Sequence, residues 1–257
     1  MDLNGAAARN TGIFYSKSKY IAFLDDDDEY LRKKLELQIK LLEKLDDTWG
    51  GVYCGYSKYK RGKLLYKWLN ASQGDLKKQV FLMENTIGGC STLLIKRSIL
   101  NELNGFDVEF SRHQDWEILS RFFRKYKLAY VNQILVKRHL DDRKNVPDIK
   151  EFIEIKARFL NKFKEDIKKM QTSMQREIFK RHYLEIARFS LLQGKFKEGK
   201  KYYEKSRMYS TLNLFDYLKL IISLLDFLFS IRYYMRELMM KHFAFLNFDK
   251  FLKKFNR

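Results

Sequence analysis

A run of five acidic residues follows a short apolar segment near the start of the chain. Residues 20–24 are typical of a β-strand, and the carboxylates of residues 25–29 come directly after them. Four adjacent aspartates repel one another, so they lie on an exposed loop or are neutralised by a cation. A hard divalent ion takes oxygen ligands and, as Mg²⁺, bridges to phosphate groups. The run therefore predicts either a cation site or a solvated acidic turn before a helix.

Three other residues could take part in the same chemistry. Asp115 stands at the start of a predicted helix, where its carboxylate could accept a proton or simply cap the helix. His139 follows the last predicted strand, and its imidazole could bind a metal ion, although a single histidine is more often packed. Arg9 lies in an alanine-rich helix, where a fixed cation suits phosphate and where a surface charge is the alternative.

Alternating helices and strands must position these residues. Apolar residues at helical spacing predict the helices, and short apolar runs between turn residues predict the strands. The predicted helices cover residues 5–17, 31–45, 76–83, 98–103 and 115–125; the predicted strands cover residues 20–24, 49–56, 64–68, 92–95, 128–131 and 134–137. This order predicts an α/β fold with a mixed sheet and flanking helices.

Beyond Pro147 the pattern predicts helices only. The predicted helices cover residues 149–170, 175–192, 196–206, 212–229 and 233–255. The last two are apolar, aromatic and basic, so they are either core helices or helices lying in a membrane interface. We therefore predict two regions, a mixed α/β region over 1–145 and an all-α region over 146–257.

Composition limits the classes of function. The 257 residues are 46% apolar, which is enough for one core and a smaller helical unit. Two cysteines give no disulfide framework and no metal-site spacing, so we expect a reducing compartment. The net charge of +19 suits an anionic lipid surface or nucleic acid, or it confers solubility alone. The basic residues are scattered and form no recognised nucleic-acid module, so we expect no nucleic-acid partner.

The order and spacing of several motifs resemble glycosyltransferase family 2, which has the GT-A fold. The resemblance covers residues 4–145 and rests on residues 8–13, the strand and acidic run of residues 20–29, and Leu35 with Gln38. It continues through three later motifs: Gly105-Phe106-Asp107, then Gln114-Asp115-Trp116-Glu117 with Arg121, and finally Arg138-His139. A partial GT-A (Rossmann-like) sheet followed by an all-α region is the fold that this resemblance implies.

The resemblance also implies roles for individual residues. Asp25 and Asp27 fall on the outer positions of the family's Asp-x-Asp motif, which holds Mg²⁺ or Mn²⁺ against the donor diphosphate. Asp27 is thus implied as a metal ligand, and Arg9, Asp25 and Asp26 are implied on the donor side. Asp115 falls on the position of the catalytic base, and His139 is implied to complete the metal shell.

The chain departs from the family pattern at its beginning. Nothing in it matches the family's first strand and turn, which bind the nucleotide base, so the strand at residues 20–24 is expected to expose an edge. We therefore expect an N-terminally truncated domain that lacks the nucleotide-binding strands.

The resemblance implies an inverting, metal-dependent transfer of a sugar from a nucleotide-diphosphate donor, a UDP-sugar, to a glycan or lipid-linked acceptor in the synthesis of cell-surface polysaccharide. We expect a cytoplasmic protein, peripheral on the inner face of the membrane. The alternative is an inactive remnant that acts through contacts of its basic helical C-terminal region with protein or membrane.

Overall fold

The protein consists of two compact units. A computed structural model describes residues 4–69, 72–84, 87–140 and 148–245, with side chains described as far as residue 229. The first unit ends at Lys169 and the second begins at Met170. The boundary that we predicted between residues 145 and 146 lies outside the described residues.

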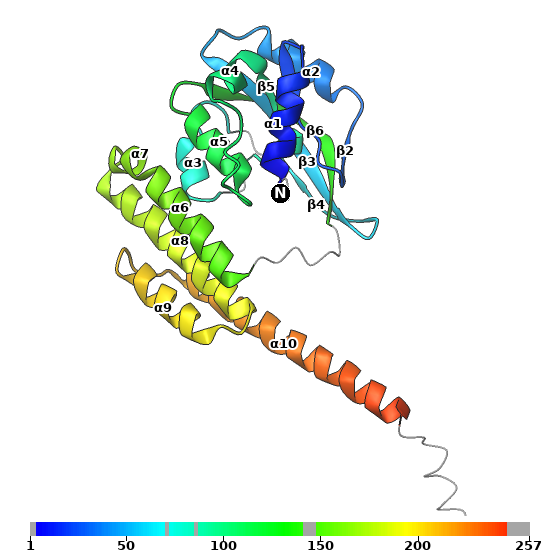
Figure 1. Ribbon diagram of the computed structural model, residues 1–257, viewed down its shortest axis with the longest axis vertical. Coiled ribbons are helices and arrows are strands. Elements are labelled where there is room, and N and C mark those ends of the chain that lie inside the picture. Colours follow the sequence, from blue (N-terminus) through cyan, green and yellow to red (C-terminus); the bar gives the residue numbers. More distant parts are fainter. Residues whose placement is uncertain (1–3, 70–71, 85–86, 141–147, 246–257) are drawn as a thin grey trace, which may run out of the picture. The chain divides into compact units, whose positions relative to one another are not determined.

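The first unit alternates helices and strands as far as β6 and then ends in two helices (Figure 1). Its helices are α1 (Gly5–Tyr15), α2 (Lys34–Leu42), α3 (Lys77–Phe81), α4 (Arg97–Glu102), α5 (Gln114–Phe122), α6 (Ile149–Lys162) and α7 (Lys164–Lys168), with a 3₁₀ turn η1 (Cys90–Thr92). Its strands are β1 (Tyr20–Ala22), β2 (Asp28–Tyr30), β3 (Trp49–Lys60), β4 (Lys63–Trp68), β5 (Leu94–Lys96) and β6 (Lys127–Leu140).

These strands form one mixed sheet in the order β1-β5-β3-β6-β2, with β4 paired to β3. β3 and β6 run parallel, and the other pairs are antiparallel. Among the described residues, β1 has only β5 as a neighbour, so it is an edge strand. A groove of about 450 Å³ runs along this edge between α1 and β1. This edge is the one that the sequence predicted to be exposed.

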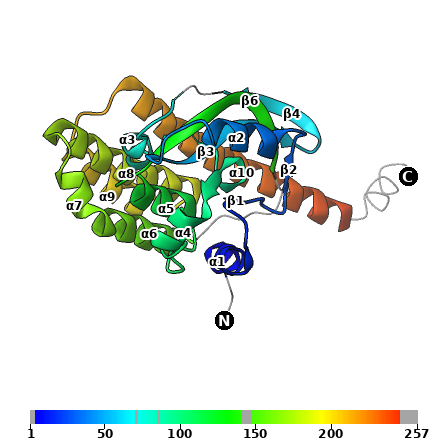
Figure 2. The same cartoon turned by 90° about the horizontal axis from the view of Figure 1, so that it is seen from above.

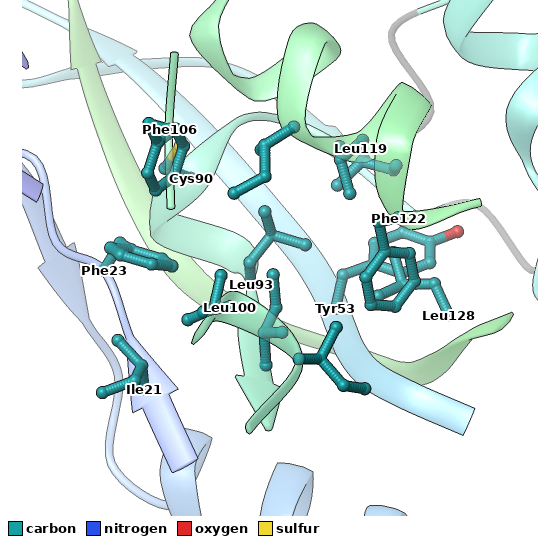
Figure 3. Close-up of a cluster of buried hydrophobic side chains, with 14 of the residues drawn as sticks. Ile21, Phe23, Tyr53, Cys90, Leu93, Leu100, Phe106, Leu119, Phe122 and Leu128 are labelled. Carbon is teal, nitrogen blue, oxygen red and sulfur yellow. The ribbon is translucent and has the colours of Figure 1, made fainter. Parts of the chain in front are cut away.

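Helices cover both faces of the sheet, as Figure 2 shows for α2 on one side and α1, α4 and α5 on the other. Alternation along the strands divides the apolar side chains between the two faces. Tyr53 and Ile95 pack beneath α4 and α5 in the larger cluster, which Figure 3 shows in close-up. Val52 and Leu94 pack beneath α2 in a smaller cluster. The sheet is therefore a buried central layer that holds the acidic run at one end of β1.

Two features of the sheet differ from the predicted elements. The two strands predicted at residues 128–131 and 134–137 are parts of one strand, β6, because irregular register against β3 interrupts the alternation near Val131. Strand β2 lies inside the acidic run, where we predicted only a turn. A three-residue acidic strand has no apolar alternation by which it could be recognised.

The second unit contains α8 (Thr172–Leu192), α9 (Phe196–Arg207) and α10 (Leu214–Phe245). Helix α10 replaces the two helices predicted at residues 212–229 and 233–255, of which residues 246–255 lie outside the described residues. Neither glycine nor proline occurs between the two predicted segments, so nothing ends the first of them. Within the described residues, no helix is both long enough and apolar enough to cross a bilayer.

Candidate active site

The acidic run forms a tight turn at the end of β1. The Asp28 amide donates to the carbonyl of Asp25 at 3.0 Å, which places Asp26 and Asp27 at the tip. The Asp25 amide in turn donates to the hydroxyl of Ser91 at 3.1 Å. Asp26 is exposed and Asp27 is half-buried, so both carboxylates can reach a ligand from solvent.

Arg9 connects this turn to the start of α5. One guanidinium nitrogen donates to the Asp25 carboxylate at 2.6 Å, and the other donates to the side-chain oxygen of Gln114 at 2.6 Å. Burial lowers the pKa of Arg9, but interactions with Cys90, the hydrogen bond to Asp25, and the carboxylates of Asp25 and Asp115 outweigh burial and raise the pKa overall. Arg9 is therefore a fixed cation that joins segments more than a hundred residues apart in the sequence.

Asp115 is the second residue of α5, directly after Gln114. Its carboxylate accepts a hydrogen bond from the Trp116 amide at 3.0 Å, whereas His113 occupies the N-cap position. Burial raises the pKa of Asp115, although the Trp116 amide and the positive charge of Arg138 and Arg9 act in the opposite direction. A carboxylate with a raised pKa is a stronger base than an exposed one once it is ionised.

Asp28 and Arg138 form an incompletely bonded pair beside the turn. The side chain of Asp28 is buried, and one of its oxygens lies 3.5 Å from Nε of Arg138. Neither that oxygen nor that nitrogen has a hydrogen-bond partner in the described structure. Burial raises the pKa of Asp28, while a hydrogen bond from Ser91 and the charge of Arg138 lower it. Buried polar atoms without partners often mark the position of a ligand.

The surroundings of Arg138 hold its guanidinium in place. It donates to the carbonyl of Gly88 and lies over the ring of Tyr56, 5.4 Å from the ring centroid. Gly89 has a φ of +92°, and a Cβ there would come within 3.4 Å of the guanidinium. The 3₁₀ turn that follows brings Ser91 to the acidic turn.

His139 lies on the opposite face of β6 from Arg138, because successive side chains of a strand point in opposite directions. Its Nε2 is 2.8 Å from the carboxylate of Glu29, and its ring stacks on Tyr59 at a centroid distance of 5.5 Å. The structure therefore brings Arg9, Asp25, Asp26, Asp27 and Asp115 to one region, whereas His139 contacts the acidic run only at its last residue, Glu29.

Sequence reasoning assigned no role to three residues of this region, Ser91, Gln114 and Arg138. Gln114 and Arg138 belong to the motifs that carry the family resemblance, and this membership could have drawn attention to them. Their contacts could not be predicted, because they depend on pairing with distant parts of the sequence. Ser91 carried no signal, since a buried serine in a short 3₁₀ turn has no distinctive spacing.

The residues at the turn suit a hard cation. Among the described residues, no three His, Cys, Asp or Glu side chains converge as a ready-made metal site. The carboxylates of Asp27 and Asp28 nevertheless offer oxygen donors next to each other, and one buried oxygen of Asp28 has no hydrogen-bond partner. Carboxylate oxygens of this kind coordinate Mg²⁺ and Mn²⁺, usually together with phosphate oxygens.

The chain is similar in sequence to known glycosyltransferases. The model of glycosyl transferase family 2 matches residues 2–103. Residues 2–103 are therefore similar to this family. An uncharacterized glycosyltransferase of Rickettsia prowazekii is 30% identical over 139 residues, which are 52% of this chain and 43% of the relative. The Escherichia coli protein WfgD, named a UDP-Glc:alpha-D-GlcNAc-diphosphoundecaprenol beta-1,3-glucosyltransferase, is 28% identical over 127 residues, 49% of this chain and 47% of that protein.

The chain spans about half the length of these curated relatives. The crystal structure of TarS from S. aureus superposes with a TM-score of 0.50 at 11% identity, covering 86% of this chain and 42% of TarS. At this identity the likeness shows the fold alone, which is a GT-A mixed sheet with flanking helices and a helical C-terminal region.

Proposed function

We propose that this protein is an inverting glycosyltransferase that moves a sugar from a UDP-sugar to a glycan or lipid-linked acceptor. The observation that carries the proposal is the position of Arg9, which contacts the acidic turn and the start of α5 at 2.6 Å each. That contact holds the two predicted halves of the site, the Asp25 turn and the Asp115 carboxylate, in one place. The name of the E. coli relative supports the donor and the acceptor classes.

The acidic turn is assigned to the donor diphosphate. Asp27 would hold Mg²⁺ or Mn²⁺, next to the Asp28 oxygen that has no hydrogen-bond partner. Asp25 and Asp26 would face the rest of the nucleotide. A bound cation stabilises the negative charge that gathers on the leaving diphosphate. Arg9 keeps Asp25 in its orientation and adds a positive charge beside the phosphates. His139 is bound to Glu29 and is left out of this assignment.

Asp115 is assigned as the general base. In its ionised form the carboxylate takes the proton of the acceptor hydroxyl as that oxygen attacks the anomeric carbon of the sugar. The raised pKa of Asp115 suits this role, since it brings the carboxylate nearer to the basicity that proton transfer needs. The hydrogen bond from the Trp116 amide fixes the orientation of the carboxylate.

We also propose that the protein works at the cytoplasmic face of a membrane, as a peripheral protein that builds cell-surface polysaccharide. Lipid-linked acceptors of the kind named for the E. coli relative are membrane-bound. The net charge of +19 gives attraction to anionic lipids.

Thermal unfolding in the presence of Mn²⁺ and UDP tests the donor site. We expect UDP to raise the melting temperature only when Mn²⁺ is present, and Asp27→Ala to abolish that rise. Glu36→Ala is the matched control, because it removes one exposed carboxylate from α2, on the other side of the sheet. An equal rise in wild type and Asp27→Ala would contradict the assignment. No rise in any variant would favour an inactive protein that acts through its helical C-terminal region.

A further inference from the structure

Helix α10 has the reverse of the usual distribution of side chains. An ordinary surface helix buries its apolar stripe and exposes its polar residues. In α10, Asp216 and Ser223 are buried, with 7% and 1% of their surface exposed. Among residues 214–229, whose side chains the structure describes, every exposed residue except Asp226 is large and apolar, each with 40% or more of its surface accessible: Leu214, Phe215, Tyr217, Leu218, Ile221, Ile222, Leu225, Leu228 and Phe229.

Contacts with α8 hold this orientation. Asp216 accepts a hydrogen bond from the buried ammonium of Lys180 at 3.2 Å. Two turns further along the helix, the Ser223 hydroxyl accepts from Arg188 at 3.4 Å and donates to the carbonyl of Lys219 at 2.8 Å. Lys180 also contacts Glu177 at 2.9 Å, but rotation of α10 about its axis would break the ion pair of Asp216 with Lys180 and is therefore opposed. The apolar outer face is therefore a fixed feature of the second unit.

The exposed side chains form one continuous surface. Leu218, Ile221, Leu225 and Leu228 recur at intervals of three and four residues, which places them on one side of the helix. Phe215, Ile222 and Phe229, seven residues apart, widen this stripe. Exposed apolar patches of this kind mark a surface that a protein or a membrane covers.

Charge favours a lipid surface as the occupant. Residues 170–257, which make up the second unit, contain 18 Lys and Arg residues against 8 Asp and Glu residues. Two such units would repel each other, which disfavours a second copy of the chain. An anionic bilayer attracts the same charge, and its interface accepts an apolar helix face lying in its plane. We infer that the outer face of α10 docks on the interface of a membrane that contains anionic lipid.

This inference rests on the proposed membrane association and names the surface responsible for it. Sedimentation of the full-length protein with vesicles tests it without donor or metal, so it can fail while the UDP measurement succeeds. Phosphatidylglycerol-containing vesicles are compared with phosphatidylcholine vesicles at low and high salt. We expect binding to the anionic vesicles, weakened by salt.

The variant Ile221→Gln/Leu225→Gln removes two apolar side chains and keeps good helix formers. We expect the affinity of this variant for anionic vesicles to fall about tenfold for each side chain removed, or about 100-fold in total. The matched control is Leu64→Gln/Leu65→Gln on β4, where the two leucines are exposed to a similar degree. Unchanged vesicle binding by the α10 variant, or an equal loss in the control, would overturn the inference.

A labelled variant covers the case in which the double substitution unfolds the protein. Ile222→Cys carries a polarity-sensitive dye on the proposed face, and Val108→Cys carries it in the first unit. The native Cys54 and Cys90 are buried, so the dye reacts with the introduced cysteine. We expect a blue shift with anionic vesicles for Ile222→Cys alone. No shift, or a dimer in sedimentation velocity without vesicles, would overturn the inference.

Discussion

Two carboxylates on α5, separated by one residue, have opposite surroundings. Glu117 is completely buried and is fully paired: Arg121 donates to it through two nitrogens at 2.7 and 2.6 Å, and Lys162 lies 2.6 Å away. Asp115 accepts hydrogen bonds from the backbone amides of Trp116 and of Asp115 itself, and no cation in direct contact is recorded for it within the described structure. The same helix thus carries one carboxylate that stabilises the fold and one that remains available for a ligand.

The same contrast separates two charged pairs: Arg121 with Glu117 on α5, and Arg138 with Asp28 beside the acidic turn. Arg121 also donates to the carbonyls of Leu103 and Gly105, so all three of its guanidinium nitrogens are hydrogen-bonded. Arg138 leaves Nε without a hydrogen bond, and its partner Asp28 leaves an oxygen without one. Buried polar groups are normally satisfied, and exceptions concentrate at functional sites. The incomplete pair of Asp28 and Arg138 lies beside the acidic turn, where we place the proposed transfer site.

The largest expected effect belongs to Asp115→Asn. Removing the proposed base should lower the rate of sugar transfer by about 10²–10⁴-fold. Binding of UDP with Mn²⁺ should persist, because the amide leaves the acidic turn intact. The transfer rate is measured as donor consumption with a lipid-linked acceptor, and a normal rate would exclude Asp115 as the base.

Glu117→Gln should act on stability instead. The amide cannot neutralise Arg121 and Lys162, so we expect the free energy of unfolding to fall by about 3 kcal/mol. Chemical denaturation measures this loss. At a temperature where the variant is folded, its UDP binding should equal that of wild type; a folded variant that cannot bind UDP would break the contrast between the two carboxylates.

The pH dependence of activity and stability should have opposite signs. Burial raises the pKa of Asp115 in the folded state, so between its ordinary value and that raised value the folded protein holds more protons than the unfolded chain. The contribution of Asp115 to the free energy of unfolding therefore falls as pH rises through this window, while the ionised base, and with it the transfer rate, increases. The difference in unfolding free energy between Asp115→Asn and wild type should grow with pH; a difference that shrinks would show a lowered pKa.

His139→Ala should have the smallest effect. His139 contacts Glu29 and Tyr59 on the face of β6 opposite to Arg138, so we expect transfer rate and Mn²⁺ dependence to stay close to those of wild type. A matched substitution, Arg138→Gln, should weaken UDP binding because it removes the cation beside Asp28. A loss of Mn²⁺ dependence in His139→Ala would restore the metal role that the sequence resemblance implied.

Local sequence patterns predicted the parts of the fold that depend on neighbouring residues. Alanine content located α1, a short apolar run located β1, and apolar residues at helical spacing located α5, each within a few residues. Helix α1 carries Arg9, β1 precedes the acidic run, and α5 carries Asp115. The pairing of Asp28 with Arg138 could not be predicted in this way, because it follows from the register of β2 against β6 across more than a hundred residues. Burial of Asp28 within an acidic run is likewise a consequence of that register, and so is the placement of His139 on the other face.

The free energy of unfolding of Asp115→Asn, measured by chemical denaturation near neutral pH, tests the central contrast most directly, because it needs no knowledge of the donor sugar or acceptor. If Asp115 is an available carboxylate held for chemistry, neutralising it removes a buried charge that the fold does not use. The protein should then be as stable as wild type or more stable. A loss comparable to that of Glu117→Gln, about 3 kcal/mol, would show that Asp115 is a structural residue and would contradict the account.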